Sequence, residues 1–450
     1  MAQSASIDVD VDVAIVGAGV AGLAAMRQLE DGGVRTCVIE ARDRIGGRIW
    51  TQHDERLPHA IELGAEFIHG SAEETVEMLE PARLLANAIN GHRWRMRGGK
   101  LRRLDDFWKQ LDVVMRHLKS DGKDESFADF LSRSPGGRSA ADARALALQF
   151  VEGFHAADPR FISAISLSEG GSPGDDREEQ RMMRISGGYQ GVPQWLARGL
   201  GERILLQRAV DRVEWERGSV TLRARDANGR SMSIRARAVI ITAPLAVLFA
   251  ETGEEGSIEF SPEPPVIDRM KGQLAAGSVA RVTLLFRERW WTEKMSALPK
   301  DESLDSLTFV QGETKEFPVC WTLHPAHVPA MVCWTGGIAA KAMADLPYEE
   351  RVDKAIVGLA KNLGVTKRRV ESQVEAAWTH NWDRDPYARG AYSYPMVGGA
   401  RAAKELARPI QNTIWFAGEA ADADGRNGTV NGAIGSGRTA AKAAARAIAT

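Results

Sequence analysis

A glycine-rich turn lies between a short apolar strand and a helix near the start of the chain. Residues 11–16 are mainly apolar and β-branched, residues 23–30 favour a helix, and the turn reads Gly17-Ala18-Gly19-Val20-Ala21-Gly22. The first glycine permits a tight turn, the second lets a pyrophosphate approach the backbone, and the third lets the helix pack on the strand. The amides at the helix N-terminus then face the phosphates. This pattern predicts a dinucleotide-binding βαβ unit.

The residues after this unit favour a flavin over a nicotinamide dinucleotide. A second expected strand, 35–39, ends at Glu40, whose carboxylate can accept both ribose hydroxyls and repel a 2′-phosphate. Gly46-Gly47 follows with Arg42 and Arg48 on either side, and guanidinium groups there suit a second diphosphate contact. A solvated charged loop is the alternative, but such a loop would not require the glycine pair.

The composition is that of an ordinary folded protein. The chain has 450 residues, which suggests two or three lobes at about 150 residues per domain. Because 58 basic and 60 acidic residues leave a net charge of −2, no global field draws the chain to nucleic acid or to an anionic membrane. The longest uncharged apolar runs, 13–26 and 238–250, are shorter than the roughly 18 to 20 residues of a membrane helix.

The N-terminal residues and the cysteines bear on location and metal chemistry. The first ten residues carry acids where a secretory signal has cationic and apolar regions, so we expect a cytoplasmic protein. Cys37, Cys320 and Cys333 are odd in number and lack C-x-x-C spacing, which argues against a disulfide framework and a zinc site. We therefore expect reduced cysteines and no metal.

Four segments resemble the flavin-containing amine oxidases, which include monoamine oxidases, polyamine and spermine oxidases, and lysine-specific histone demethylases. They are residues 13–48, 62–70, 187–189 and 415–437, and the resemblance covers nearly the whole chain. In its motifs the chain is most similar to soluble bacterial members of the polyamine oxidase type. The resemblance implies a two-lobed α/β fold, in which a Rossmann-like FAD-binding domain joins an α+β substrate-binding domain.

Both domains are expected to be discontinuous in sequence. The FAD-binding domain is assigned to residues 1–85, 187–274 and 376–450, and the substrate-binding domain to residues 86–186 and 275–375. The apolar spacing in 105–119 predicts a packing helix. Segments rich in β-formers predict a sheet at the floor of the substrate cavity, at 282–286, 307–311, 319–323 and 331–334.

Two further segments bear on the cavity and on the surface. Residues 170–184 mix glycine, proline and both charge signs, which predicts a mobile loop or a gate over the cavity. A basic cluster surrounds Gly98-Gly99 and consists of Arg93, Arg95, Arg97, Lys100, Arg102 and Arg103. The glycine pair splits it into two short strands, so we expect these cations on the solvent-facing side of a hairpin, with nucleic-acid binding as the alternative.

The resemblance also implies the residues that hold FAD. They are Gly17, Ala18, Gly19, Val20, Ala21, Gly22, Glu40, Ala41, Arg42, Gly47, Arg48, Gly64, Ala65, Glu66, Phe67, Val210, Trp382, Gly418, Glu419, Thr429 and Val430. A helix is expected at 430–448, and its N-terminal dipole would favour negative charge on the flavin pyrimidine. Ala391 stands where monoamine oxidases carry the cysteine that bonds the flavin, so FAD is expected to be non-covalent.

The expected catalytic residues follow from the same resemblance. Trp382 and Tyr392 match the two aromatic walls before the flavin, and Thr429 stands where monoamine oxidases have a second cage tyrosine. Arg281 replaces the usual lysine near flavin N5, and because arginine is effectively never deprotonated, this substitution puts the oxygen chemistry in question. His69 either hydrogen-bonds the amine or is structural.

The resulting hypothesis is an FAD-dependent oxidase that converts an amine to an imine or aldehyde and releases hydrogen peroxide. Molecular oxygen is the expected second substrate, no nucleic acid or membrane partner is expected, and a homodimer is left open. We expect a substrate without an α-carboxylate, such as a secondary amine or polyamine. An acid at Glu66 would attract an ammonium group, unless Glu66 is a solvated or structural carboxylate, and Arg281 is the one residue that could instead pair with a carboxylate. The alternatives are a flavin desaturase or isomerase, an L-amino acid oxidase, and a catalytically weak flavin-bound scaffold.

Overall fold

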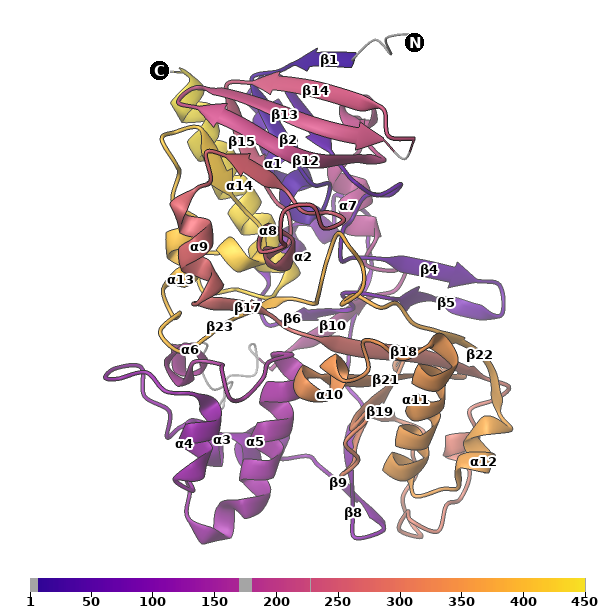
Figure 1. The fold of residues 1–450 in the computed structure, drawn as a ribbon. Coiled ribbons are helices and arrows are strands. Elements are labelled where there is room, and N and C mark those ends of the chain that lie inside the picture. The colour runs from indigo at the N-terminus through magenta and orange to yellow at the C-terminus, as the bar shows by residue number, and fades with distance from the viewer. Residues whose placement is uncertain (1–6, 170–179, 227, 450) are drawn as a thin grey trace.

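The computed structural model describes residues 7–169, 180–226 and 228–449. The upper part of the molecule in Figure 1 is built around a parallel sheet with the strand order β11-β3-β2-β15-β24. Its strands come from distant parts of the chain: β11 (Ile204–Leu205), β3 (Thr36–Ile39), β2 (Val13–Val16), β15 (Ala238–Ile241) and β24 (Ile414–Phe416). All residues of the last four strands are buried, as expected for parallel strands that are covered on both faces.

Two helices cover one face of the parallel sheet. They are α1 (Val20–Asp31), which follows the glycine turn, and α14 (Val430–Ala449), the helix predicted at the end of the chain. The two pack against each other, and Gly437 permits the close approach, because a Cβ there would lie 2.2 Å from the carbonyl oxygen of Ala21.

A second sheet, here called the hairpin sheet, covers the other face. Its order is β1-β14-β13-β12-β16, from β1 (Ile7–Asp10), β14 (Ser231–Ala236), β13 (Ser219–Asp226), β12 (Arg208–Glu216) and β16 (Glu259–Ser261). A hairpin at Asn228-Gly229 joins β13 and β14, and the amide of Gly229 donates to the carbonyl of Asp226 at 2.9 Å.

The lower part of the molecule contains a large sheet with the order β22-β18-β21-β20-β19-β8-β9. The strands are β22 (Val374–Trp378), β18 (Val279–Phe286), β21 (Ala330–Gly336), β20 (Val319–Thr322), β19 (Leu307–Gln311), β8 (His92–Arg97) and β9 (Lys100–Arg103). The four strands predicted between 282 and 334 are neighbours in this sheet, so that prediction is confirmed. Helix α11 (Tyr348–Leu363) packs on one of its faces.

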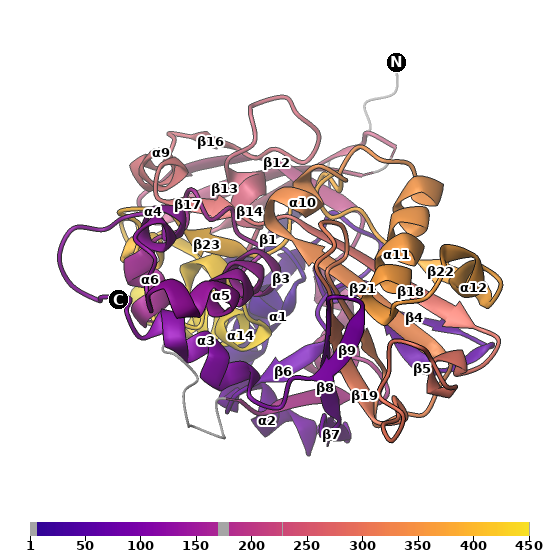
Figure 2. The same cartoon turned by 90° about the horizontal axis from the view of Figure 1, so that it is seen from below.

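Helices stand opposite the large sheet. Seen from below in Figure 2, they lie on one side of the molecule and the large sheet on the other. They are α3 (Phe107–Met115), α4 (Phe127–Ser132), α5 (Ala141–Phe154) and α6 (Ala164–Glu169). The packing helix predicted at 105–119 is α3, whose apolar face is buried against α5.

Small sheets connect the two parts. They are β6 (Phe67–His69) with β10 (Met182–Ile185) and β7 (Ala86–Ala88), β17 (Leu274–Ala276) with β23 (Ser393–Pro395), and β4 (Thr51–Asp54) with β5 (Leu57–Glu62). The loop predicted at 170–184 is wrong at its end, because residues 182–184 pair with β6 and β7. Residues 170–179 of that segment lie outside the described part of the chain. Strand β17 spans the border that we placed between residues 274 and 275, and the domain borders stay predictions.

The remaining helices are short. They are α2 (Glu73–Leu79), α7 (Gly191–Leu196), α8 (Leu245–Leu248), α9 (Pro265–Lys271), α10 (Gly337–Lys341), α12 (Lys367–Glu371) and α13 (Ala402–Leu406). Within the described ranges, no helix has the length and apolar character needed to cross a membrane. Cys37, Cys320 and Cys333 are all buried and free.

Candidate active site

A cavity of about 800 Å³ lies between the two parts of the molecule. At one end, it is lined by the glycine turn before α1 and by segments that follow β3 and β24. At the other end, it is lined by the large sheet, α3 and α5. The cavity is therefore continuous from the expected dinucleotide site to the space above the large sheet.

The glycine turn has the shape that a pyrophosphate needs. A Cβ at Gly22 would lie 2.0 Å from the carbonyl oxygen of Gly17, so only glycine lets α1 pack this closely on the turn. A Cβ at Gly19 would meet nothing within 4 Å, and Gly19 lines the cavity. The backbone at Gly19 is thus accessible to a phosphate group.

Glu40 fixes the same turn from the end of β3. Its carboxylate accepts hydrogen bonds from the backbone amides of Ala18 at 2.7 Å and Arg42 at 2.9 Å. Burial raises the pKa of this carboxyl group. Because each carboxylate oxygen can accept more than one hydrogen bond, Glu40 keeps the capacity to bind ribose hydroxyls.

Most residues expected to hold FAD line the cavity. They are Gly17, Gly19, Val20, Ala21, Glu40, Ala41, Arg42, Gly47, Arg48, Gly64, Ala65, Glu66, Phe67, Val210, Trp382, Gly418, Glu419, Thr429 and Val430. The structure places Ala18 and Gly22 behind the cavity wall, where they shape the turn. Arg42 is paired with Asp385 at 2.5 Å and Arg48 with Glu419 at 3.0 Å, so only their remaining N–H groups are open to phosphate.

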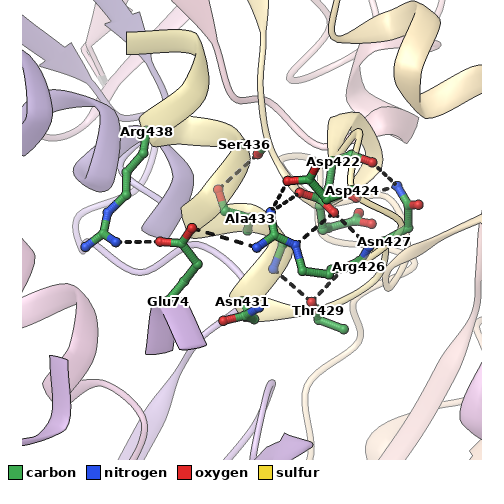
Figure 3. A network of polar contacts seen from close by, with 12 residues as sticks. Glu74, Asp422, Asp424, Arg426, Asn427, Thr429, Asn431, Ala433, Ser436 and Arg438 are labelled. Carbon is green, nitrogen blue, oxygen red and sulfur yellow. Dashed lines mark hydrogen bonds and ion pairs between the residues drawn. The ribbon is translucent and has the colours of Figure 1, made fainter. Parts of the chain in front are cut away.

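Polar residues before α14 form a hydrogen-bonded network at the N-terminus of this helix (Figure 3). The hydroxyl of Thr429 accepts from the amide of Gly432 at 2.9 Å and donates to the carbonyl of Arg426 at 2.6 Å. Arg426 pairs with Asp422 at 2.8 Å and with Glu74 of α2 at 3.7 Å. Thr429, expected in the substrate cage, therefore caps α14, and the positive end of the helix dipole opens on the cavity.

Both predicted aromatic walls, Trp382 and Tyr392, line the cavity. The indole N–H of Trp382 donates to the carbonyl of Leu63 at 2.8 Å, and the ring packs edge-on against His380 at 4.4 Å between centroids. The hydroxyl of Tyr392 donates to the carbonyl of Phe154 at 2.6 Å. Burial raises the pKa of this phenol, so it stays protonated. These bonds fix the orientation of both rings.

Glu66 forms a buried ion-pair cluster with two arginines. One carboxylate oxygen lies 2.6 Å from Arg184 and the other 2.5 Å from Arg281, and all three side chains are at most 5% exposed. Trp321 donates to both oxygens at 3.2 Å. Burial alone would raise the pKa of Glu66, but the two guanidinium groups hold it below its usual value.

Of the two interpretations of Glu66, this cluster favours the structural carboxylate over a partner for a substrate ammonium, because the charge of Glu66 is already more than balanced. It also shows what Arg281 does where the family has a lysine. Arg281 lines the cavity and donates to the carbonyl of Gly64 at 3.3 Å, but its charge is directed at Glu66. The long, planar side chain of Arg281 reaches the carboxylate of Glu66, whereas the shorter side chain of a lysine at this position would end closer to β18.

His69 opens on the far part of the cavity, beside Phe154 and Phe67, whose rings lie 5.3 and 5.8 Å away between centroids. Desolvation of the ring inside the cavity, and then the positive charge of Arg93, lower the pKa of His69 to about 4. The imidazole is therefore neutral at physiological pH and can accept a hydrogen bond from an amine. The structure thus brings His69, Trp382, Tyr392 and Arg281 to one cavity.

Arg93 corrects the expectation that the basic cluster faces solvent. The predicted hairpin forms as β8 and β9, and Arg97, Lys100, Arg102 and Arg103 are exposed, but Arg93 lines the cavity. Sequence reasoning also missed His155, Phe150 and Phe154 of the α5 region, which line the same space. Because successive side chains of a strand point to opposite faces, the sequence places Arg93 and Trp94 on opposite faces of β8. It does not indicate which of these faces borders a cavity.

Comparison with known proteins connects this site to one family. The family model for "Flavin containing amine oxidoreductase" matches residues 20–97 and 86–445. Lysine-specific histone demethylase 2 of Homo sapiens is 28% identical over 472 residues, which cover 96% of this chain and 53% of that protein. Polyamine oxidase 4 of Oryza sativa subsp. japonica is 27% identical over 460 residues, which cover 95% and 87%. The chain thus spans about half the length of the demethylase.

A solved structure shows the same fold. Cyclohexylamine oxidase from Brevibacterium oxydans IH-35A superposes with a TM-score of 0.77 at 23% identity, covering 98% of this chain and 100% of that one. The α/β amine oxidase fold predicted from the sequence is confirmed by this likeness.

Proposed function

The chain belongs to the family of flavin-containing amine oxidoreductases, with FAD as cofactor, and from this premise we propose how it acts. In our proposal it oxidises the carbon–nitrogen bond of an amine to an imine, which water hydrolyses to a carbonyl compound. The two electrons pass to molecular oxygen, which leaves as hydrogen peroxide. The observation that carries the proposal is the single cavity that joins the glycine turn to the aromatic walls Trp382 and Tyr392.

The residues at the dinucleotide end fit FAD. The backbone at Gly19 is open, Glu40 can receive ribose hydroxyls, and the capped N-terminus of α14 favours negative charge. When bound there, FAD supplies the acceptor for a hydride from the carbon next to the amine nitrogen. The chain's own residues have to orient that carbon and keep the nitrogen unprotonated.

The charges around the cavity favour a neutral amine. The cluster of Glu66, Arg184 and Arg281 carries one net positive charge, and Arg281 lines the cavity. Nearby positive charge lowers the pKa of a bound ammonium group, so the amine gives up its proton more readily. Neutral His69 can then accept a hydrogen bond from the amine N–H without competing for the proton.

The same charges bear on the substrate class. The polyamine version of the proposal draws support from the 27% identity with a polyamine oxidase, but the ion pairs of Glu66 remove its expected ammonium partner. An L-amino acid oxidase would need a free cation close to the reacting carbon. Arg281 is the candidate nearest to that position by its sequence match, and its charge is already directed at Glu66. We therefore favour amines without an α-carboxylate.

Anaerobic mixing of the FAD-loaded protein with amines tests the proposal. The panel contains benzylamine, hexylamine, spermidine, an N-acetylated polyamine and L-amino acids, and the readout is bleaching of the visible band of oxidised flavin. Amines should bleach the band, and admission of oxygen should restore it with one hydrogen peroxide per cycle. Bleaching by none of the amines would contradict the proposal and favour the scaffold or the desaturase alternative.

A pair of variants tests the aromatic wall. Tyr392→Phe keeps the ring and loses only the bond to Phe154, whereas Tyr392→Leu removes the wall. If the ring orients the amine, the leucine variant should slow flavin reduction at least about tenfold relative to the phenylalanine variant, because misplacement of the reacting atoms raises the barrier. Equal rates for the two variants would contradict that role.

A further inference from the structure

Arg93 is a cation in the wall of the cavity that has no counter-ion among the described residues. It lies on β8, opposite Phe309 of the parallel neighbour β19. Its guanidinium lies 4.5 Å from the ring centroid of Phe309, 4.9 Å from that of Phe107 and 5.9 Å from that of Trp108. Among the residues that the structure describes, no carboxylate lies within salt-bridge distance of Arg93. The rings orient the guanidinium but leave its positive charge in place.

The carboxylates of the described cavity wall already have partners. Within the described lining, the carboxylates are Glu40, Glu66 and Glu419. Glu40 accepts two backbone amides, Glu66 pairs with two arginines, and Glu419 pairs with Arg48. A substrate with a second ammonium group therefore finds no open carboxylate among these residues, whereas an anionic group finds Arg93.

Ring contacts lead from the aromatic walls to Arg93. Tyr392 bonds to the carbonyl of Phe154, and from the ring of Phe154 three successive ring contacts of 5.3, 5.8 and 6.0 Å lead through His69 and Phe67 to Phe309. Arg93 stacks on that last ring. Tyr392 contacts Gly428 just before α14, at the dinucleotide end of the cavity, whereas Arg93 lies on the large sheet beside Phe107 of α3. A carboxylate on the reacting carbon would stay near the walls, so the substrate group that reaches Arg93 is the one at the end remote from the amine.

We propose that Arg93 binds a carboxylate at the distal end of the substrate, so that the preferred substrate is an amine with a carboxylate several carbons from the reacting nitrogen. This inference rests on the proposed amine oxidation. The planar guanidinium matches a carboxylate with two parallel hydrogen bonds. A phosphate dianion would call for a second unpaired cation, and the described lining of this end offers only Arg93. The aromatic wall between the two ends contacts the apolar chain of the substrate.

Three amines of equal chain length test the proposal directly: hexylamine, 6-aminohexanoate and hexane-1,6-diamine. They share the reacting amine and differ only in a neutral, anionic or cationic distal end, and norleucine adds a carboxylate on the reacting carbon. The 8-carbon homologues cover a longer reach. We expect kcat/KM to be highest for an ω-aminocarboxylate and lowest for the diamine, with norleucine below hexylamine. A diamine preferred over the ω-aminocarboxylates would overturn the inference while leaving amine oxidation in place.

Variants assign the preference to Arg93. In Arg93→Met, the ratio of kcat/KM for the ω-aminocarboxylate over hexylamine should fall about 10- to 100-fold, the loss expected for one charge-assisted contact. Arg93→Lys should retain part of the ratio. Arg102→Met, which removes an exposed cation from the same hairpin, is the matched control and should keep the wild-type ratio. An unchanged ratio in Arg93→Met would overturn the inference.

A binding experiment separates this inference from the proposed function. Hexanoate has the distal carboxylate but no amine, and its dissociation constant can be measured through tryptophan fluorescence without turnover. We expect weaker binding in Arg93→Met and wild-type binding in Arg102→Met. If no amine reduces the flavin, the proposed function fails, and loss of hexanoate binding in Arg93→Met still supports an anion site. Equal hexanoate binding in both variants would overturn that site as well.

Discussion

Replacement of Glu66 by glutamine should destabilise the protein more than replacement of Arg281 by methionine. The three buried side chains of the cluster, Glu66, Arg184 and Arg281, carry a net charge of one positive unit. Glu66→Gln raises this to two, with neither arginine compensated. Arg281→Met instead leaves one intact pair between Glu66 and Arg184, and so a neutral cluster.

The structure sets the size of the difference. Removing one partner of a buried ion pair costs about 3–5 kcal/mol, because the remaining charge stays buried without compensation. Glu66→Gln leaves two such charges, so we expect a loss at least in this range. Arg281→Met also removes a buried Nε–H that has no hydrogen-bond partner in the described part of the chain, and we expect a loss of about 1–2 kcal/mol.

Guanidinium chloride unfolding with saturating FAD, followed by tryptophan fluorescence, measures both effects. Transition midpoints are compared, because a chain of this size need not unfold in one step. Glu62→Gln is the matched control: Glu62 is as buried as Glu66, but it bonds to the amide of Tyr189 and the hydroxyl of Thr51 in place of arginine. A midpoint for Glu66→Gln equal to or above that of Arg281→Met would refute the reasoning.

Three further predictions concern the cofactor, oxygen and pH. Because Ala391 offers no thiol, acid precipitation should release all flavin into the supernatant as FAD, and Glu40→Ala should weaken FAD binding by about 1.5–3 kcal/mol in an equilibrium titration; flavin retained in the pellet would contradict this. If Arg281 acts at the position of the family lysine, Arg281→Lys should speed reoxidation of reduced flavin by oxygen and Arg281→Met should slow it, as stopped-flow absorbance would show. Burial raises the pKa of Glu62 from 4.5 to about 7, so the folded state binds this proton more tightly than the unfolded state does. The contribution of Glu62 to stability should therefore be lost as the pH rises from 4.5 to about 7. Glu62→Gln should flatten the pH dependence of the thermal midpoint over this interval.

The parts of the fold that could be predicted from the sequence are those set by residues close together in the chain. The strand, turn and helix around Gly17, Gly19 and Gly22 follow from local backbone requirements, and the structure reproduces them. The helix at α3 follows from the spacing of apolar residues on one face, since that pattern is stable only against a core. The family resemblance assigned His69, Trp382 and Tyr392 to one site, although they are far apart in the chain. In the structure all three line the same cavity.

The charge pairing in the cavity could not be predicted in this way. Glu66 pairs with Arg184 and Arg281, which are 118 and 215 residues away in the sequence. The sequence pattern around Glu66 does not indicate either partner. The same holds for Arg93, because a hairpin with cations on one face looks identical whether that face meets solvent or a cavity. Its direction is decided by α3 and β19, whose rings surround it.

The strand order of the parallel sheet also determines when, during synthesis of the chain, the FAD-binding part can be completed. Strands β3 and β2 leave the ribosome early, but their sheet is completed by β24, and α1 waits for α14 to cover it. At about 5–20 residues per second, the ribosome needs on the order of tens of seconds to make the intervening chain. During this interval the glycine turn of the nascent chain lacks β24 and α14, which complete its site. Binding of FAD is therefore expected late in synthesis or after it. A chaperone that shields the early strands would therefore act before the cofactor can.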